Sequence, residues 1–117
     1  MRPDVVAELA AVLQQRRKAD PESSYVAGLY AAGLNKILEK VSEESTEVLL
    51  AARDLRDPSV VNQTNERPLA DALANEVADL WFHTMVLLTE CDIDPQEVPA
   101  ILANRFGVSG IEEKRNR

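Results

Sequence analysis

Cysteine, histidine and aromatic residues are scarce in this sequence of 117 residues. Its single cysteine, Cys91, can form no disulfide within the chain and cannot build a cysteine-rich zinc site, which fits a reducing cytoplasm. Basic residues are in the minority, because 13 Lys and Arg stand against 20 Asp and Glu and leave a formal charge of −7. General nucleic-acid binding needs a basic face, so this charge balance argues against it.

Long hydrophobic runs are absent too. The longest apolar stretch is too short to cross a bilayer. Glu8 interrupts the apolar residues near the N-terminus, and no cleavage-type site follows them, so we expect no signal peptide. A chain of this length suits one domain over 1–117, and we expect it in the cytoplasm without a membrane partner.

Strand periodicity is also missing, and the pattern of apolar residues is helical. Helices are expected over residues 3–18, 25–31, 34–55, 69–90 and 95–105. Residues 56–68 are polar, with turn residues and no periodicity, and are either a mobile loop or part of the rim of a site. The tail, 108–117, is either floppy or folded over a ligand. We therefore expect an all-α bundle of four to five helices.

Capping residues support these boundaries. Ser23 or Ser24 can cap the second helix, and Gly33 separates it from the long helix that follows. Asp94 followed by Pro95 supplies an N-cap and a proline at the first position of the last helix.

Two pairs of acidic residues stand out against this background. Glu44 with Glu47, and Glu76 with Asp79, are each spaced i, i+3, which places both carboxylates of a pair on one face of a helix. The second pair lies in a nearly continuous apolar segment, and no Lys or Arg occurs from 69 to 104 to neutralise it. Buried acids must be paired or bound to metal. Two facing pairs would form a cage of four carboxylates for a hard cation such as Mg²⁺.

Other interpretations of these residues stay open. Glu44 and Glu47 taken alone also fit a solvated helix face. For His83, one turn beyond Asp79, a core histidine or one that orients Asp79 is preferred over a metal ligand. A di-iron site needs Glu-x-x-His motifs, and this chain has only one histidine at a different spacing.

Helix 69–90 is apolar on almost every side, and a chain of this size has few helices with which to surround it. We therefore expect a homodimer of C2 symmetry in which this helix also packs against a partner chain.

Four segments together carry a resemblance to a known family. They are Ser-Ser-Tyr-Val-Ala-Gly-Leu at 23–29, Gly-Leu-Asn-Lys-Ile-Leu-Glu-Lys-Val-Ser-Glu-Glu-Ser-Thr-Glu at 33–47, Asn-Glu-Val-Ala-Asp-Leu-Trp-Phe-His-Thr-Met-Val-Leu-Leu at 75–88 and Arg-Phe-Gly-Val-Ser-Gly-Ile-Glu-Glu-Lys at 105–114. In this order they resemble the phosphoribosyl-ATP pyrophosphatases of histidine biosynthesis, which belong to the all-α, MazG-like nucleotide pyrophosphohydrolases. The resemblance implies Mg²⁺-dependent hydrolysis of phosphoribosyl-ATP to phosphoribosyl-AMP and pyrophosphate. It also implies that Mg²⁺ is held by Glu44, Glu47, Glu76 and Asp79.

Two departures from the family pattern are visible. Ser42 stands where relatives often carry glycine, which a helix tolerates. The connection 56–68 is longer than usual, so no role is assigned to its residues.

Further site residues are expected around the acids. Glu43 or one of the ligand carboxylates is the candidate base for the attacking water. Lys36 and Lys40 follow the same helix edge as the acids and are either phosphate contacts or solvated lysines. Arg105 is a weaker candidate for substrate contact, as are Lys114 and Arg115. Two rivals to the implied activity are hydrolysis of other nucleoside triphosphates and a non-catalytic dimerisation module with structural acids.

Overall fold

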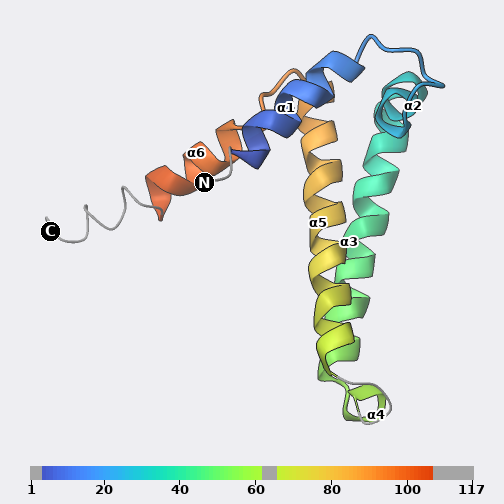
Figure 1. Ribbon diagram of the computed structural model, residues 1–117, viewed down its shortest axis with the longest axis vertical. Coiled ribbons are helices and arrows are strands. Elements are labelled where there is room, and N and C mark those ends of the chain that lie inside the picture. The colour runs from blue at the N-terminus through green and yellow to red at the C-terminus, as the bar shows by residue number, and fades with distance from the viewer. Residues whose placement is uncertain (1–3, 62–65, 107–117) are drawn as a thin grey trace, which may run out of the picture.

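The computed structural model describes residues 4–61 and 66–106, which form helices and turns without a strand (Figure 1). The helices are α1 (Val5–Arg16), α2 (Tyr25–Ala32), α3 (Leu34–Arg56), α4 (Pro58–Val61), α5 (Glu66–Glu90) and α6 (Glu97–Arg105). The all-α class predicted from the sequence is confirmed. None of these helices combines the length and the apolar character that crossing a membrane requires.

The segment 56–68 is where the sequence prediction was wrong. Asp57 caps α4, since its carboxylate accepts hydrogen bonds from the amide and the hydroxyl of Ser59, at 2.9 and 2.8 Å. Pro58 takes the first helical position, where its missing N–H costs nothing. The prediction placed Pro68 at the end of this connection, but it lies in the first turn of α5, which begins at Glu66 and tolerates proline there.

The predicted boundaries around α2 are confirmed. The hydroxyl of Ser24 accepts a hydrogen bond from the amide of Ala27 at 3.1 Å and so caps the helix. Gly33 ends α2 and precedes α3 with φ of 99°, a backbone conformation that suits glycine. The last helix begins two residues later than predicted, at Glu97, although the carboxylate of Asp94 still accepts from the amide of Gln96 at 2.9 Å.

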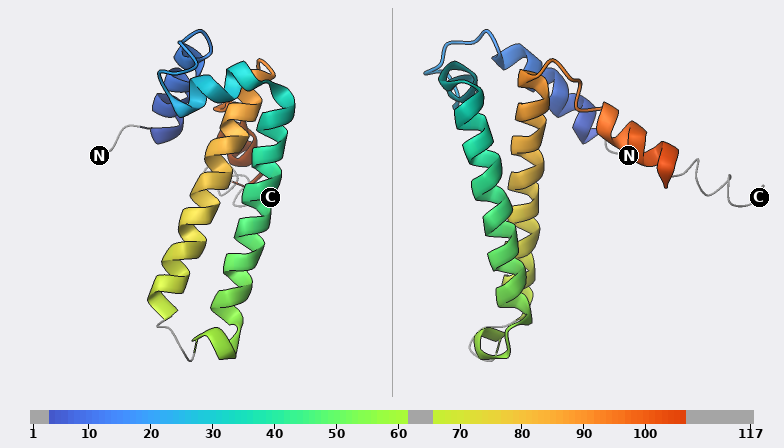
Figure 2. Two further views of the ribbon diagram at one scale, coloured as in Figure 1. Left: turned by 90° about the vertical axis from the view of Figure 1, so that its right-hand side faces the viewer. Right: turned by 180° about the vertical axis from the view of Figure 1, so that it is seen from behind.

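The two long helices, α3 and α5, run side by side in opposite directions and form a hairpin closed by α4 (Figures 1 and 2). Helix α2 crosses the open end of this hairpin, and α1 lies against the C-terminal part of α5. Helix α6 projects sideways from the hairpin (Figure 1). The hairpin therefore places one face of α3 directly opposite one face of α5.

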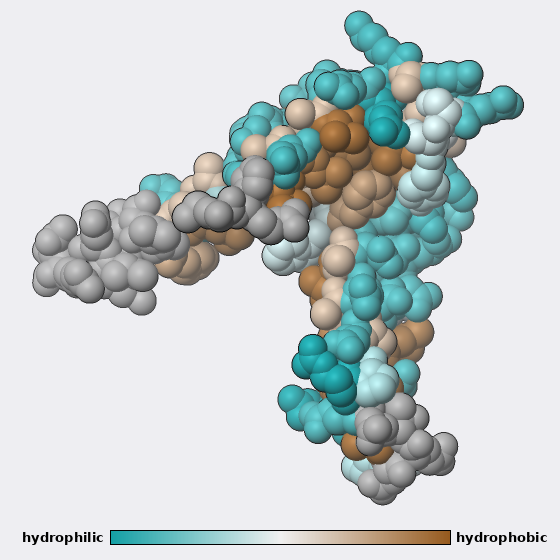
Figure 3. All heavy atoms as spheres, in the orientation of Figure 1, coloured by the Kyte–Doolittle hydropathy of each residue, from teal (hydrophilic) through white to brown (hydrophobic). Residues whose placement is uncertain are grey.

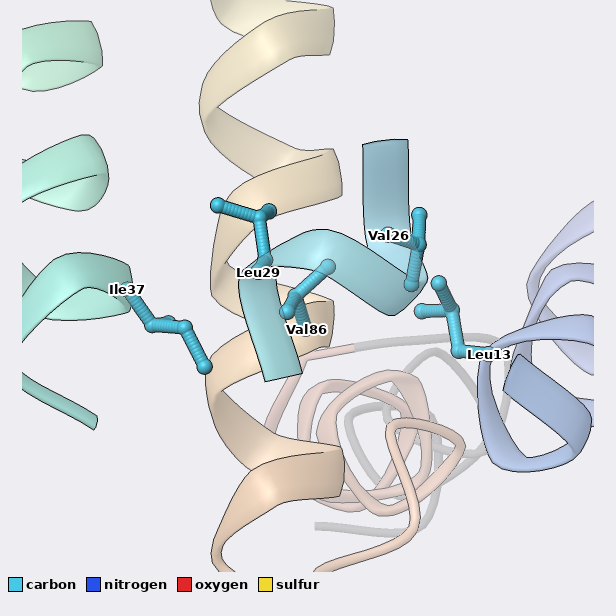
Figure 4. Packing of buried hydrophobic residues seen from close by; sticks show 5 residues of the cluster. All are labelled: Leu13, Val26, Leu29, Ile37 and Val86. Atoms are coloured by element: carbon cyan, nitrogen blue, oxygen red, sulfur yellow. The ribbon is translucent and has the colours of Figure 1, made fainter. Parts of the chain in front are cut away.

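A small hydrophobic core holds the open end of the hairpin together. It is built from Leu13 of α1, Val26 and Leu29 of α2, Ile37 of α3 and Val86 of α5 (Figure 4). Each such side chain stabilises the fold by about 1.5–3 kcal/mol when fully buried. Four helices thus meet at this end.

The described chain is extended and leaves much apolar surface open. Its radius of gyration is 17.6 Å, whereas a compact domain of this size has a radius of about 13 Å. Trp81 lies in the nearly continuous apolar segment of α5, and 66% of its surface is exposed in the single chain. Apolar residues also reach the surface between α1 and α2, over the C-terminal end of α5 (Figure 3).

Candidate functional site

Three carboxylates from the two long helices meet between α3 and α5. One carboxylate oxygen each of Glu44, Glu76 and Asp79 lies within 4.8 Å of the others. Glu44 comes from α3 and the other two from α5, so the antiparallel packing of the hairpin creates the group. The i, i+3 spacing that the sequence shows on α5 puts Glu76 and Asp79 on the side that faces α3.

Glu47 is not a member of this group of three, but it lies close enough to act on it. Partial loss of hydration raises the pKa of Glu76, and the negative charges of neighbouring acids raise it further. In order of effect these neighbours are Glu47, Asp79 and Glu44. All four acids singled out in the sequence therefore share one electrostatic site.

Lys40 lies at the edge of this site. Its ammonium is 2.9 Å from a carboxylate oxygen of Glu43 and 3.9 Å from one of Glu44. The hydrogen bond to Lys40 lowers the pKa of Glu43. A lower pKa makes Glu43 a weaker base, which favours a ligand carboxylate for activating water; the assignment of the base stays a prediction.

The other predicted cations are not gathered at the acids. Lys36 is half-exposed and its ammonium lies 3.7 Å from a carboxylate oxygen of Glu39, on the same helix. Arg105 is in the last turn of α6, which projects away from α3 (Figures 1 and 2). Lys114 and Arg115 lie outside the described residues, as does the tail 108–117.

His83 is a buried histidine that is not part of the group formed by Glu44, Glu76 and Asp79. Its Nδ1 is 2.8 Å from the main-chain oxygen of Asp79, and its Nε2 is 2.8 Å from the hydroxyl of Tyr25. Because a carbonyl only accepts, Nδ1 donates; in the neutral imidazole Nε2 then accepts the proton of the Tyr25 hydroxyl. Both nitrogens are thus engaged, and the preferred interpretation of His83 as a core histidine fits.

Tyr25 is a residue of this site to which the sequence pattern gave no role. It is the first residue of α2, and 54% of its surface is exposed. Partial burial raises the pKa of Tyr25, the charge of Lys40 opposes this, and the acids Glu44, Glu43 and Asp79 add to it. Tyr25 therefore lies within electrostatic range of both the carboxylates and the lysine. A serine cap in the sequence predicted where α2 begins. No pattern in the residues around Tyr25 indicated that its side chain lies near the carboxylates.

The chemistry of the donors suits a hard divalent cation. The group offers only carboxylate oxygens, which Mg²⁺ prefers, and neither imidazole nor thiol takes part. The side chain of Glu44 is only 13% exposed, Glu76 is partly buried and Asp79 is exposed, so three charges of one sign lie close together at a partly solvated site. A bound cation would relieve this repulsion, and the residues present therefore fit Mg²⁺.

Comparison with known proteins finds a family model and relatives whose names agree with one another. A family model described as Phosphoribosyl-ATP pyrophosphohydrolase matches residues 6–106. A protein of Hydrogenovibrio crunogenus is 45% identical over 117 residues, which is 100% of this chain and 96% of that protein. Proteins of Burkholderia vietnamiensis and Burkholderia mallei are each 46% identical over 114 residues, covering 97% of this chain and 87% and 86% of their own lengths. All three relatives are named phosphoribosyl-ATP pyrophosphatase.

Proposed function

This chain belongs to the phosphoribosyl-ATP pyrophosphohydrolase family, and from that premise we propose that it hydrolyses phosphoribosyl-ATP to phosphoribosyl-AMP and pyrophosphate in histidine biosynthesis. The family resemblance predicted from the sequence is confirmed. The observation that carries the proposal is the meeting of Glu44, Glu76 and Asp79 between α3 and α5. Such a group of oxygens suits a nucleotide hydrolase that works with a metal ion.

We propose Mg²⁺ as the cofactor, held by Glu44, Glu76 and Asp79, with Glu47 as a further ligand. Bound there, Mg²⁺ would neutralise charge on the phosphates and polarise the phosphorus. The four acids come from two packed helices, which hold their positions more precisely than loops would.

The chain's own side chains would position the reactants. The products require that water cleave the anhydride between the α- and β-phosphates, by attack on one of these two phosphorus atoms while the bridging oxygen leaves with the other. A carboxylate of the site accepts the proton of this water, and Lys40 offers its ammonium to a phosphate oxygen. Catalysis of this kind is mostly positioning and electrostatic stabilisation.

The first test is the reaction itself. Purified protein incubated with phosphoribosyl-ATP and Mg²⁺ should release pyrophosphate, and excess chelator should remove the activity. Parallel assays with the common nucleoside triphosphates should show lower kcat/KM, which separates this function from general triphosphate hydrolysis. Orthophosphate as the first product, or full activity in chelator, would show that the proposal is wrong.

Lys40→Ala should weaken substrate use without weakening the metal site. The ammonium can contact a phosphate but cannot bind a cation, so we expect KM to rise about tenfold, the effect of losing one charge-assisted hydrogen bond. Mg²⁺ affinity should stay equal or increase, because a positive charge 3.9 Å from Glu44 is removed. Lys18→Ala removes an exposed lysine elsewhere and serves as control. Loss of Mg²⁺ affinity with an unchanged KM would contradict this role.

We also propose that the protein is a homodimer that covers the apolar side of α5. A groove of about 360 Å³ runs between α1, α5 and α6, and its lining includes Val6, Trp81, Met85 and Leu102. A second apolar surface continues along α5 from Ala70 to Trp81. The extended shape and the small core of one chain support a second copy as the occupant, since such surface is costly to leave in water.

A further inference from the structure

The orientation of the Tyr25 ring is held by three contacts with two residues, His83 and Phe82. Its hydroxyl lies 2.8 Å from Nε2 of His83. The ring stacks on Phe82 with centroids 6.5 Å apart and planes 25° apart, and it meets the His83 ring edge-on at 5.8 Å. The buried imidazole of His83 therefore holds in place the ring of an exposed residue.

This fixed ring is linked through His83 to the segment of α5 that carries the proposed metal ligands. A single imidazole joins its hydroxyl to the main chain of Asp79, since Nδ1 of His83 donates to the Asp79 carbonyl at 2.8 Å. The charge of Lys40 also acts on the Tyr25 hydroxyl. A nucleotide whose phosphates lie at the carboxylates and Lys40 thus has an exposed aromatic face beside it.

We propose that Tyr25 contacts the substrate by stacking its exposed ring on the adenine base, and that His83 is the positioning residue that holds this ring. The inference rests on the proposed function, because it takes an adenine nucleotide as substrate. Stacking needs only a planar π-face and a preset orientation, and the described contacts supply both. Removing an aromatic ring that stacks on one base weakens binding by about tenfold or more.

Nuclear magnetic resonance of tyrosine-labelled protein tests the contact without using activity. The chain has only two tyrosines, and Tyr30, on the same helix, packs against the core and serves as an internal control. Adding the product phosphoribosyl-AMP with Mg²⁺ should shift the ring resonances of Tyr25 and leave those of Tyr30 in place. Ribose 5-phosphate, which lacks the base, should not shift Tyr25. Tyr25 resonances that stay in place at saturating product would overturn the proposal.

Kinetics of variants test the positioning role of His83. Tyr25→Leu should raise KM about tenfold or more and change kcat far less, whereas Tyr30→Phe should match wild type. Tyr25→Phe and His83→Asn each break the hydrogen bond and should raise KM by a similar, smaller factor. The double variant should be no worse than His83→Asn alone, because that substitution already removes the hydrogen bond that Tyr25→Phe deletes. Lower thermal stability with an unchanged KM would show a structural role only and overturn the proposal.

The activity assays, together with the oligomeric mass and the melting temperature, separate a failure of the proposed function from a failure of the role of Tyr25. Wild type that fails to hydrolyse phosphoribosyl-ATP refutes the proposed function itself. Active wild type with a Tyr25→Leu variant of equal KM refutes only the role of Tyr25. A Tyr25→Leu variant whose oligomeric mass changes would assign the ring to a subunit contact, and it too would overturn the proposal. The Mg²⁺-induced rise in melting temperature should be the same in Tyr25→Leu and wild type.

Discussion

Glu76→Gln and Asp79→Asn should each remove most of the activity while leaving the metal-free protein at least as stable as wild type. Both substitutions keep the shape of the side chain and delete its charge. We expect a loss of at least about 100-fold, since even a residue that only supports a metal ligand contributes 10–100-fold. Stability should not fall, because partial loss of hydration and the neighbouring acids already disfavour the charged form of Glu76 and raise its pKa.

Stabilisation by Mg²⁺ should also distinguish the two variants from wild type. Mg²⁺ at a hundredfold excess over its dissociation constant should stabilise wild type by about 2.7 kcal/mol, and the two variants much less. Melting curves with and without Mg²⁺ measure both effects. Asp71→Asn is the matched control, because Asp71 is an exposed acid of α5 that pairs with Arg67 at 3.0 Å instead.

A loss of stability in the metal-free variants would instead indicate that Glu76 and Asp79 have a structural role. Removing one partner of a buried ion pair costs about 3–5 kcal/mol. Within residues 4–61 and 66–106, the ion pairs include neither Glu76 nor Asp79. A large loss of metal-free stability in these variants, with no response to Mg²⁺, would therefore refute the metal site and favour a non-catalytic helical module.

Trp81→Glu should convert the protein from a dimer to a monomer. Trp81 lines both apolar surfaces of α5, and 66% of its surface is exposed, so a charge there is tolerated by one chain but not by an interface. Wild type at micromolar concentration should have twice the chain mass of 12.9 kDa, and the variant should have the mass of one chain.

Light scattering measures the mass, and Trp81→Phe controls for loss of the indole while keeping an apolar side chain. The melting temperature of wild type should also depend on protein concentration, because a dimer with a small core in each chain loses stability on dilution. A strictly monomeric wild type at micromolar concentration would contradict the dimer.

Local patterns in the sequence were sufficient for the helices and for the acid pairs. The Ser24 cap, the glycine at position 33 and the apolar periodicity set most boundaries, since each acts within a few residues. The spacing of Glu76 and Asp79 placed both on one face of a helix. The missed helix α4 was within reach of the same rules, because Asp57 followed by Pro58 is a start signal like Asp94 followed by Pro95.

The tertiary structure alone decided which of these faces meet. Glu44 joins Glu76 and Asp79 only because α3 and α5 pack antiparallel, and Tyr25 reaches His83 across 58 residues of chain. Trp81 lies in a segment that looks buried, yet one chain has too few helices to cover it. Helix periodicity records which side of a helix is apolar or acidic, but not what lies opposite. Contacts between distant segments arise from packing, which no local pattern specifies.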